Sequence, residues 1–289
     1  TEFPIKEQLD LVALGTIADV VQLDQNNRRL VHEGLRRIRA GRARPGLNAL
    51  IEISGLDRTT LHTRDLAFSV APRLNAAGRL QDMTVGIECL LSTGDRALEL
   101  ATHLDELNQE RREIEANMRD QALQFLEELS LDDRKIAGLC VYRDNWHEGV
   151  VGIIASRIKE RAFRPVIAFA PVADGELKGS GRSVAGFHMR DALDAIATRH
   201  PGLLLRFGGH AMAAGLSLKR ADFEQFSAAF DVEVVKSLGE ANQEQVVTTD
   251  GALGEDISIH TARLLESAAP WGQGLPEPEF DDDFEVLEQ

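Results

Sequence analysis

The stretch that decides the fold covers residues 136–170 and reads IAGLCVYRDNWHEGVVGIIASRIKERAFRPVIAFA. Two short apolar runs, 136–141 and 165–170, have the length and composition of buried strands. Residues 150–161 lie between them, follow Gly149, and carry isoleucines at helical spacing. A strand, a helix and a second strand in succession predict an α/β or α+β domain.

The same alternation continues after this stretch. Residues 177–183 predict a short strand or loop, and 189–198 and 221–238 predict helices. The elements up to residue 238 together predict one domain of roughly a hundred residues. Short strands are also expected near the end of the chain, at 246–249 and 284–287.

A long helix is expected before this domain. Residues 95–129 contain no proline or glycine and carry an apolar stripe opposite a charged face. A helix of this length is typical of a connection between two domains, and a helix packed along one domain is the alternative. Four shorter helices are expected upstream, at 6–21, 27–40, 46–54 and 63–70. The last should end before Pro72, because a proline disfavours helix in the residue that precedes it.

Length and charge limit the functional classes. A chain of 289 residues predicts about two domains. The net charge of −15 argues against nucleic-acid binding over the whole surface. Five arginines between residues 36 and 44 leave a local basic groove possible, and a solvated helix face is the simpler interpretation.

The compartment is predicted from what the sequence contains. Cys89 and Cys140 lie in apolar contexts without metal-ligand spacing, which indicates reduced core cysteines. No apolar run approaches the roughly 18 residues of a membrane span. The first residues have no signal-peptide pattern. We therefore expect a cytoplasmic protein, and because residue 1 is Thr, we expect an internal fragment.

Residues 205–218, LRFGGHAMAAGLSL, are the first candidate site. Gly208 and Gly209 remove two Cβ atoms where another group can approach the backbone. His210 can donate to an anion or exchange protons near neutral pH. The combination suits a phosphate pocket. The alternative is a tight turn with a surface histidine before a buried helix.

Two further candidates lie in the first hundred residues. Asp19 is a lone carboxylate among apolar and small residues, and a hard cation such as Mg²⁺ or Mn²⁺ would satisfy it if it is buried. A helix cap or a structural salt bridge is the alternative. In residues 71–80, APRLNAAGRL, Arg73 and Arg79 bracket small residues, which suits phosphate binding as well as a surface turn.

Two candidates lie in the α/β domain. Residues 143–152, RDNWHEGVVG, run into a glycine-flanked helix start, a place where anions bind. Residues 178–183, KGSGRS, suit a phosphate-contact loop or a flexible surface loop. All these clusters set Arg, Ser or His among Gly and Ala, and this shared composition favours a polyanionic ligand.

The order of these motifs carries a family resemblance. Four of them resemble the later motifs of the RecJ family: LVALGTIADVV at 11–21, PRLNAAGR at 72–79, GSGRS at 179–183 and GGHAMAAG at 208–215. PWGQGLPEP at 270–278 resembles the junction segment of the same family. RecJ proteins are bacterial exonucleases that digest single-stranded DNA 5′→3′ and belong to the DHH phosphoesterase superfamily.

The resemblance implies an α/β architecture with four parts. Residues 1–94 would be the C-terminal, helical part of the catalytic DHH domain, and 95–130 the linking helix. Residues 131–240 would be the mixed-sheet DHH-associated domain. Residues 241–289 would form the junction and the start of an oligonucleotide-binding β-barrel.

The resemblance also implies roles for single residues. Asp19 would be a metal ligand, and His210 would be the catalytic histidine that contacts the phosphate near the metals. The implied phosphate- or strand-binding residues are Arg73, Asn75, Arg79, Ser180, Arg182, Gly208 and Gly209. The implied cofactor is Mn²⁺ or Mg²⁺. The implied partner is single-stranded DNA, with a single-strand-binding protein or a helicase as further candidates and no membrane.

The sequence departs from the family pattern in one respect. It has no Asp-His-His tripeptide and no Asp-x-Asp motif before Asp19. Metal-assisted hydrolysis needs several ligands, so we expect a fragment that lacks the catalytic N-terminal half, is inactive alone and is limited to substrate binding. The alternatives are a small-substrate DHH phosphoesterase and a non-catalytic nucleic-acid-binding module. The related domain of alanyl-tRNA synthetase shares the Gly-Gly-His pattern but would not explain the motifs of Asp19 and Arg73.

Overall fold

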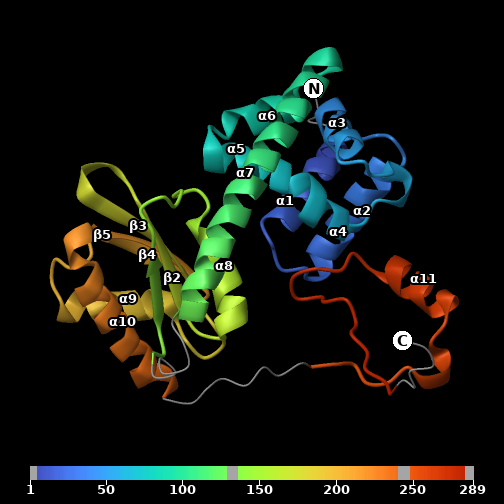
Figure 1. Cartoon of the computed structure of the whole chain (residues 1–289). Coiled ribbons are helices and arrows are strands. Elements are labelled where there is room, and N and C mark those ends of the chain that lie inside the picture. Colours follow the sequence, from blue (N-terminus) through green and yellow to red (C-terminus); the bar gives the residue numbers. More distant parts are fainter. Residues whose placement is uncertain (1–4, 129–135, 240–247, 284–289) are drawn as a thin grey trace. The chain divides into compact units, whose positions relative to one another are not determined.

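The computed structural model describes residues 5–128, 136–239 and 248–283 (Figure 1). The chain divides into two compact units. The first unit comprises Thr1–Gln109 and Val246–Gln289, and the second comprises Glu110–Gln245.

The first unit is helical. Its shorter helices are η1 (Ile5–Gln8), α1 (Leu9–Ala18), α2 (Gln25–Arg39), α3 (Pro45–Ile53), η2 (Arg58–Thr60), α4 (Thr63–Asp65), α5 (Ala71–Leu80) and α6 (Thr84–Leu91). Leucine, isoleucine and valine side chains from these helices form one buried core, with Val31, Leu50 and Leu104 almost fully shielded from solvent. The helices expected at 6–21, 27–40 and 46–54 are confirmed, with ends shifted by a few residues.

The chain does not leave the helix before Pro72, contrary to our expectation. A π-helical turn over Leu66–Val70 joins α4 directly to α5. Pro72 is the second residue of α5 and lies inside this continuous helical path, where a proline cannot supply the N–H of a helical hydrogen bond. The π turn directly before it is a local irregularity of the kind found where a helix passes a proline.

The long helix is confirmed as α7 (Gly94–Glu128). Its first half contributes Leu100 and Leu104 to the core of the first unit. Its second half contributes Met118 and Ala122 to a core of the second unit. One uninterrupted helix therefore belongs to both units.

The second unit is built on a five-stranded mixed sheet, which confirms the predicted α/β class. Its strands are β1 (Leu139–Tyr142), β2 (Val166–Pro171), β3 (Glu176–Arg182), β4 (Arg206–Gly209) and β5 (Ala213–Lys219), in the spatial order β1-β2-β3-β5-β4. Strands β1 and β2 run parallel, and the other pairs are antiparallel. The helices are α8 (Val151–Ala162), α9 (Met189–Arg199) and α10 (Phe223–Leu238).

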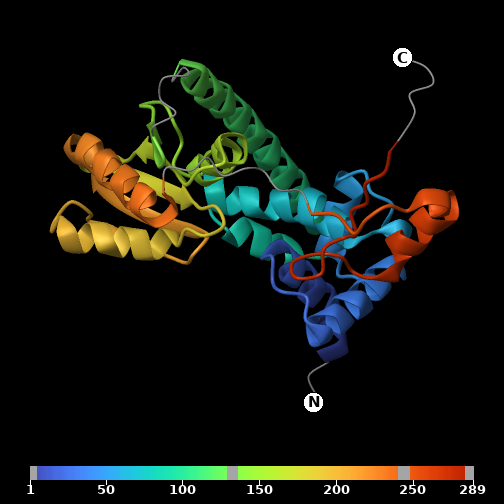
Figure 2. The ribbon, with the colours of Figure 1, turned by 90° about the horizontal axis from the view of Figure 1, so that it is seen from below.

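The helices divide between the two faces of this sheet (Figures 1 and 2). Helices α9 and α10 cover one face, where Phe169, Leu216 and Phe226 are buried. Helix α8 packs on the other face together with the end of α7, over β1, β2 and β3, where Val166 and Ala168 are buried. On this second face, the residues of β4 and β5 are largely exposed. We call it the α8-side face.

Residues 205–218 form a β-hairpin, so the alternative of a turn before a buried helix is wrong. In β5, Ala214, Leu216 and Leu218 are buried while Gly215 and Lys219 are exposed. This period of two is the pattern of a strand that is covered on one face. The run of small residues hides the pattern in the sequence, because Ala and Gly mark neither face strongly.

Residues 248–283 contain η7 (Gly254–Asp256), α11 (Ile259–Ala268) and one isolated bridge between Gly272 and Leu275, and no strand is present within this range. The Thr63 hydroxyl donates a 2.7 Å hydrogen bond to the carbonyl of Trp271, which holds the segment on the first unit. The segment lines a cavity of about 1020 Å³ with the ends of α1 and α4. The strand expected at 284–287 and half of that at 246–249 lie outside the described residues, so the start of a barrel stays a prediction.

Cys89 and Cys140 are free thiols, and burial raises the pKa of Cys89 to about 11. Among the described residues, no helix is both long enough and apolar enough to cross a membrane.

Candidate nucleic-acid interface

The α8-side face of the sheet carries a line of small residues across three strands. Ser180 of β3 pairs with Gly215 of β5, and Gly215 pairs with Gly208 of β4. We call these three residues the glycine row. Gly208 and Gly215 are exposed, so the row leaves a strip of backbone that side chains do not cover.

The fold itself does not explain the glycines of this row. A Cβ added at Gly208 would meet no atom within 4 Å, and at Gly215 it would meet only the carbonyl of Gly179 at 4.0 Å. Glycine weakens a strand and often marks a place where a ligand or another backbone approaches closely. The row is therefore a candidate contact for the sugar–phosphate backbone of a nucleic acid.

Gly209 differs from its neighbour Gly208. Its φ is +144°, and an added Cβ would lie 2.4 Å from the Cα of Ala214. The next residue, His210, donates its backbone N–H to the carbonyl of Ala213 at 2.8 Å, which closes the hairpin. Gly209 thus has a structural role that places the exposed His210 at the end of β4. Binding by either residue stays a prediction.

Ser180 and Arg182 lie next to the start of α8. The guanidinium of Arg182 donates to Ser180 Oγ at 2.9 Å and to the carbonyl of Gly181 at 2.8 Å. A Cβ at Gly152 would lie 2.9 Å from Arg182 Nη2 and 3.0 Å from Ser180 Oγ, so glycine makes room for both side chains. A hydroxyl, a guanidinium and the positive end of a helix dipole therefore lie together, an arrangement suited to an anion.

Sequence reasoning did not select Gly152 or Gly215 as binding residues. Gly152 ends the 143–152 cluster, and Gly215 lies in the 205–218 stretch, so both were within motifs that we singled out. The sequence alone does not show which residues of neighbouring strands lie opposite one another. The register that aligns Gly215 with Ser180 and Gly208 becomes visible only in the sheet.

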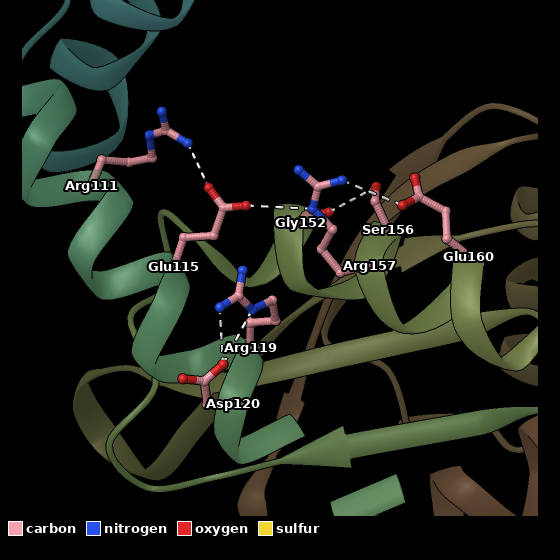
Figure 3. A network of polar contacts seen from close by, with 8 residues as sticks. All are labelled: Arg111, Glu115, Arg119, Asp120, Gly152, Ser156, Arg157 and Glu160. Carbon is pink, nitrogen blue, oxygen red and sulfur yellow. Dashed lines mark hydrogen bonds and ion pairs between the residues drawn. The ribbon is translucent and has the colours of Figure 1, made fainter. Parts of the chain in front are cut away.

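One ion pair joins α8 to α7 within a network of polar contacts on the two helices (Figure 3). Glu115 of α7 accepts from Arg111 at 2.6 Å and lies 3.5 Å from Arg157 of α8. Glu115 and Arg111 are only 14% and 11% exposed, so water screens this pair less than a surface pair. This pair adds to the apolar packing of α8 on α7, which positions the helix start beside Ser180 and Arg182.

Asp19 is exposed at the end of α1, so our premise of a buried carboxylate is wrong. The backbone N–H groups of Val20 and Val21 donate to Ile17 and Thr16, which forms a helix-ending motif that usually has glycine at the position of Val20. Val20 has a φ of 53°, a conformation that is strained for a β-branched residue. The negatively charged carboxylate of Asp19 also lies at the C-terminal end of α1, where the negative end of the helix dipole repels it. Unfavourable local placement of this kind is common at functional sites.

Asp19 does not form a metal site with its neighbours. No group of three or more His, Cys, Asp or Glu side chains that could hold a metal lies within the parts of the chain that the structure describes. One carboxylate does not fill the coordination sphere of Mg²⁺ or Mn²⁺. Asp19 can therefore act only as one ligand of a site completed by other residues.

Replacing Val20 with glycine should raise the free energy of unfolding by about 1 kcal/mol, because the change removes a left-handed strain of about 1–2 kcal/mol. Val20 is 64% exposed, so little packing is lost. Urea denaturation of the two proteins measures the difference. Val21→Gly is the control, because Val21 has no positive φ and should lose stability. A less stable Val20→Gly variant would contradict the strain.

The cluster on α5 divides into buried and exposed residues. Arg73 is buried and donates to Asp105 of α7 at 2.8 Å and to the carbonyl of Ser69 at 2.6 Å. Asn75 and Arg79 are exposed, and their spacing of four places them on the same side of the helix. Asn75 and Arg79 are thus accessible to a strand. Arg73 is buried, and its guanidinium has two protein partners.

The chain is similar to known proteins along almost its whole length. Residues 134–236, which include the sheet of the second unit, match the DHHA1 domain. The chain is 56% identical to the single-stranded-DNA-specific exonuclease RecJ of Dickeya dadantii and 52% identical to that of Escherichia coli. Each alignment covers 99% of this chain and 50% of the relative. The chain thus spans about half the length of these curated relatives.

Solved structures give the same result. The crystal structure of RecJ from Thermus thermophilus in complex with Mg²⁺ superposes with a TM-score of 0.79 at 34% identity. It covers 96% of this chain, which corresponds to 42% of that protein. A complex of the same protein with Mn²⁺ matches with the same TM-score. Divalent metals are therefore bound by a structural relative of this chain.

Proposed function

The chain belongs to the RecJ family, and from this membership we propose that it is part of a metal-dependent exonuclease that hydrolyses single-stranded DNA in the 5′→3′ direction. The proposal rests above all on the α8-side face, where Ser180 and Arg182 flank a strip of bare backbone at Gly208 and Gly215. Single strands carry one phosphate per nucleotide, and a hydroxyl and a guanidinium are groups that bind phosphate.

Within this activity, the chain supplies the strand-binding surface and is inactive alone. Asp19 contributes one ligand to Mn²⁺ or Mg²⁺, and the remaining ligands come from other residues of the complete protein. Asn75, Arg79, Gly209 and His210 contact the strand or its phosphates. The setting that fits this chemistry is DNA repair and recombination in the cytoplasm, with a single-strand-binding protein or a helicase as protein partner.

In the complete protein, Arg182→Ala and His210→Ala should each lower turnover on a long single strand about 100-fold, because each removes a group that stabilises charge at the phosphate. The thermal unfolding midpoint should stay unchanged. The measurement is release of nucleotides from a labelled strand in the presence of Mn²⁺.

The matched controls are Arg190→Ala and His260→Ala. Arg190 is exposed on α9, on the opposite side of the sheet, and His260 is exposed on α11. Turnover of the Arg182 and His210 variants at the level of these controls would refute the assigned roles. Faster cleavage of dinucleotides than of long strands would favour a small-substrate phosphoesterase. Metal-dependent nucleotide release by the 289-residue chain alone would overturn its proposed inactivity.

A further inference from the structure

A second line of polar residues runs beside the glycine row. Lys178 of β3 pairs with Ser217 of β5, and Ser217 pairs with Arg206 of β4. Each of the three lies two residues along its strand from a member of the glycine row, so all three belong to the α8-side face. We call them the second row. The two rows are about 6.8 Å apart.

Ser217 is the unusual member of the second row. Its side chain lies on the face opposite the buried Leu216 and Leu218, yet the residue is only 8% exposed. Its hydroxyl lies between the two basic side chains of the second row, because Ser217 pairs with Lys178 on one side and with Arg206 on the other. A hydroxyl in this position can donate a hydrogen bond to an anion that the two cations attract.

The charges around the second row favour the same ligand. Lys178, Arg206 and Lys219 are exposed on this face. Lys178 pairs with Glu148 at 2.7 Å, and Arg206 lies 3.9 Å from Glu176. Both are surface ion pairs, and Arg206 is 83% exposed. Such pairs contribute little free energy, so a phosphate can replace the two glutamates at little cost. The chain as a whole has a net charge of −15, so the positive charge on this face is a local property and does not reflect the overall composition.

We propose that Lys178, Ser217 and Arg206 form a second phosphate-binding row, which holds the phosphate next to the one at the glycine row. This inference rests on the proposed function, because it requires that a strand lies on the α8-side face. Arg206 and Lys178 supply charge, and Ser217 donates a hydrogen bond. None of the three is a group needed for hydrolysis, so the second row determines how firmly the strand is held.

The test measures binding of the whole 289-residue chain to a fluorescent oligothymidylate by anisotropy, over a range of salt concentrations. Arg206→Ala should weaken binding about tenfold, as expected for loss of one charge-assisted hydrogen bond. It should also lower the salt dependence, the slope of log K against log salt, by about 0.7, the value for one phosphate contact of a single strand.

Three further variants make the test specific. Arg206→Lys should keep the slope, because it keeps the charge. Ser217→Ala should weaken binding about threefold without changing the slope, because it removes a neutral donor. Arg190→Ala removes one positive charge from the opposite side of the sheet and should leave affinity and slope near those of the unchanged protein.

The outcomes separate this inference from the proposed function. If the unchanged chain binds the strand and Arg182→Ala weakens it, but Arg206→Ala behaves like Arg190→Ala, the second row is refuted and the proposed function stands. If the unchanged chain does not bind single strands, both are refuted. If Arg206→Ala lowers both the affinity and the salt slope while Arg190→Ala lowers neither, the second row is supported.

Discussion

Gly209→Ala should destabilise the second unit by about 3 kcal/mol, whereas Gly208→Ala should leave it as stable as before or slightly more stable. At Gly209 the added Cβ would lie 2.4 Å from the Cα of Ala214 and 2.5 Å from the carbonyl of Ala213, and φ is +144°. Overpacking and an unfavourable backbone conformation each cost about 1–3 kcal/mol. At Gly208 no atom lies within 4 Å of the added Cβ, and alanine is favoured over glycine in a strand by about 0.5–1 kcal/mol.

Gly208→Ala should weaken the binding of a single strand although it does not lower stability. The alanine methyl group would cover the bare backbone of the glycine row, so affinity for a single strand should fall at least about tenfold although the fold is intact. Urea denaturation and anisotropy on the same two variants measure both effects. If Gly208→Ala binds the strand as tightly as the unchanged chain, no ligand approaches this backbone closely, and the glycine row is not a contact surface.

Arg73→Ala should lower the free energy of unfolding by about 3 kcal/mol, because the partly buried carboxylate of Asp105 loses its cationic partner and keeps only the neutral donor Gln109. Arg73 and Asp105 are 11% and 19% exposed, so water compensates the lost ion pair only in part. Arg79→Ala should change stability by no more than about 0.5 kcal/mol, as expected for an exposed side chain.

A double-mutant cycle with Asp105→Asn tests the reason for this loss. If the Arg73–Asp105 pair joins α5 to α7, the two changes should be non-additive by at least about 1 kcal/mol. Affinity for a single strand is the second readout. Should Arg73→Ala weaken binding without lowering stability, then Arg73 acts on the strand rather than between the helices, as the family resemblance alone implies.

Much of the fold follows from local pattern. The 35-residue helix α7 was predictable because its sequence after Gly94 contains no residue that ends a helix. Helix α8 was predictable because its apolar residues recur at helical spacing. Strand β2 was predictable because its apolar residues form an uninterrupted run. The hairpin of β4 and β5 was not, because Ala213, Ala214 and Gly215 carry little hydrophobic contrast between its two faces.

The candidate site was predictable in type but not in extent. Ser180, Arg182 and Gly208 lie in motifs whose composition already suggested a phosphate ligand. Gly152 and Ser217 take their meaning from residues distant in sequence: Ser180 and Arg182 approach Gly152, and Lys178 and Arg206 flank Ser217. Such pairing is set by the register of strands and the packing of a helix, which no local pattern contains. The exposure of Asp19 was missed for the same reason, since apolar neighbours in sequence did not bury it.

The regular pleat of the sheet has a consequence for movement. Successive rows on the α8-side face repeat every two residues, the first with two exposed glycines and the second with Lys178, Ser217 and Arg206. A strand bound as we propose would exchange the phosphate contacts of one row for those of the next when it advances by one step. Because phosphates are the same at every nucleotide, such a step would not depend on the bases.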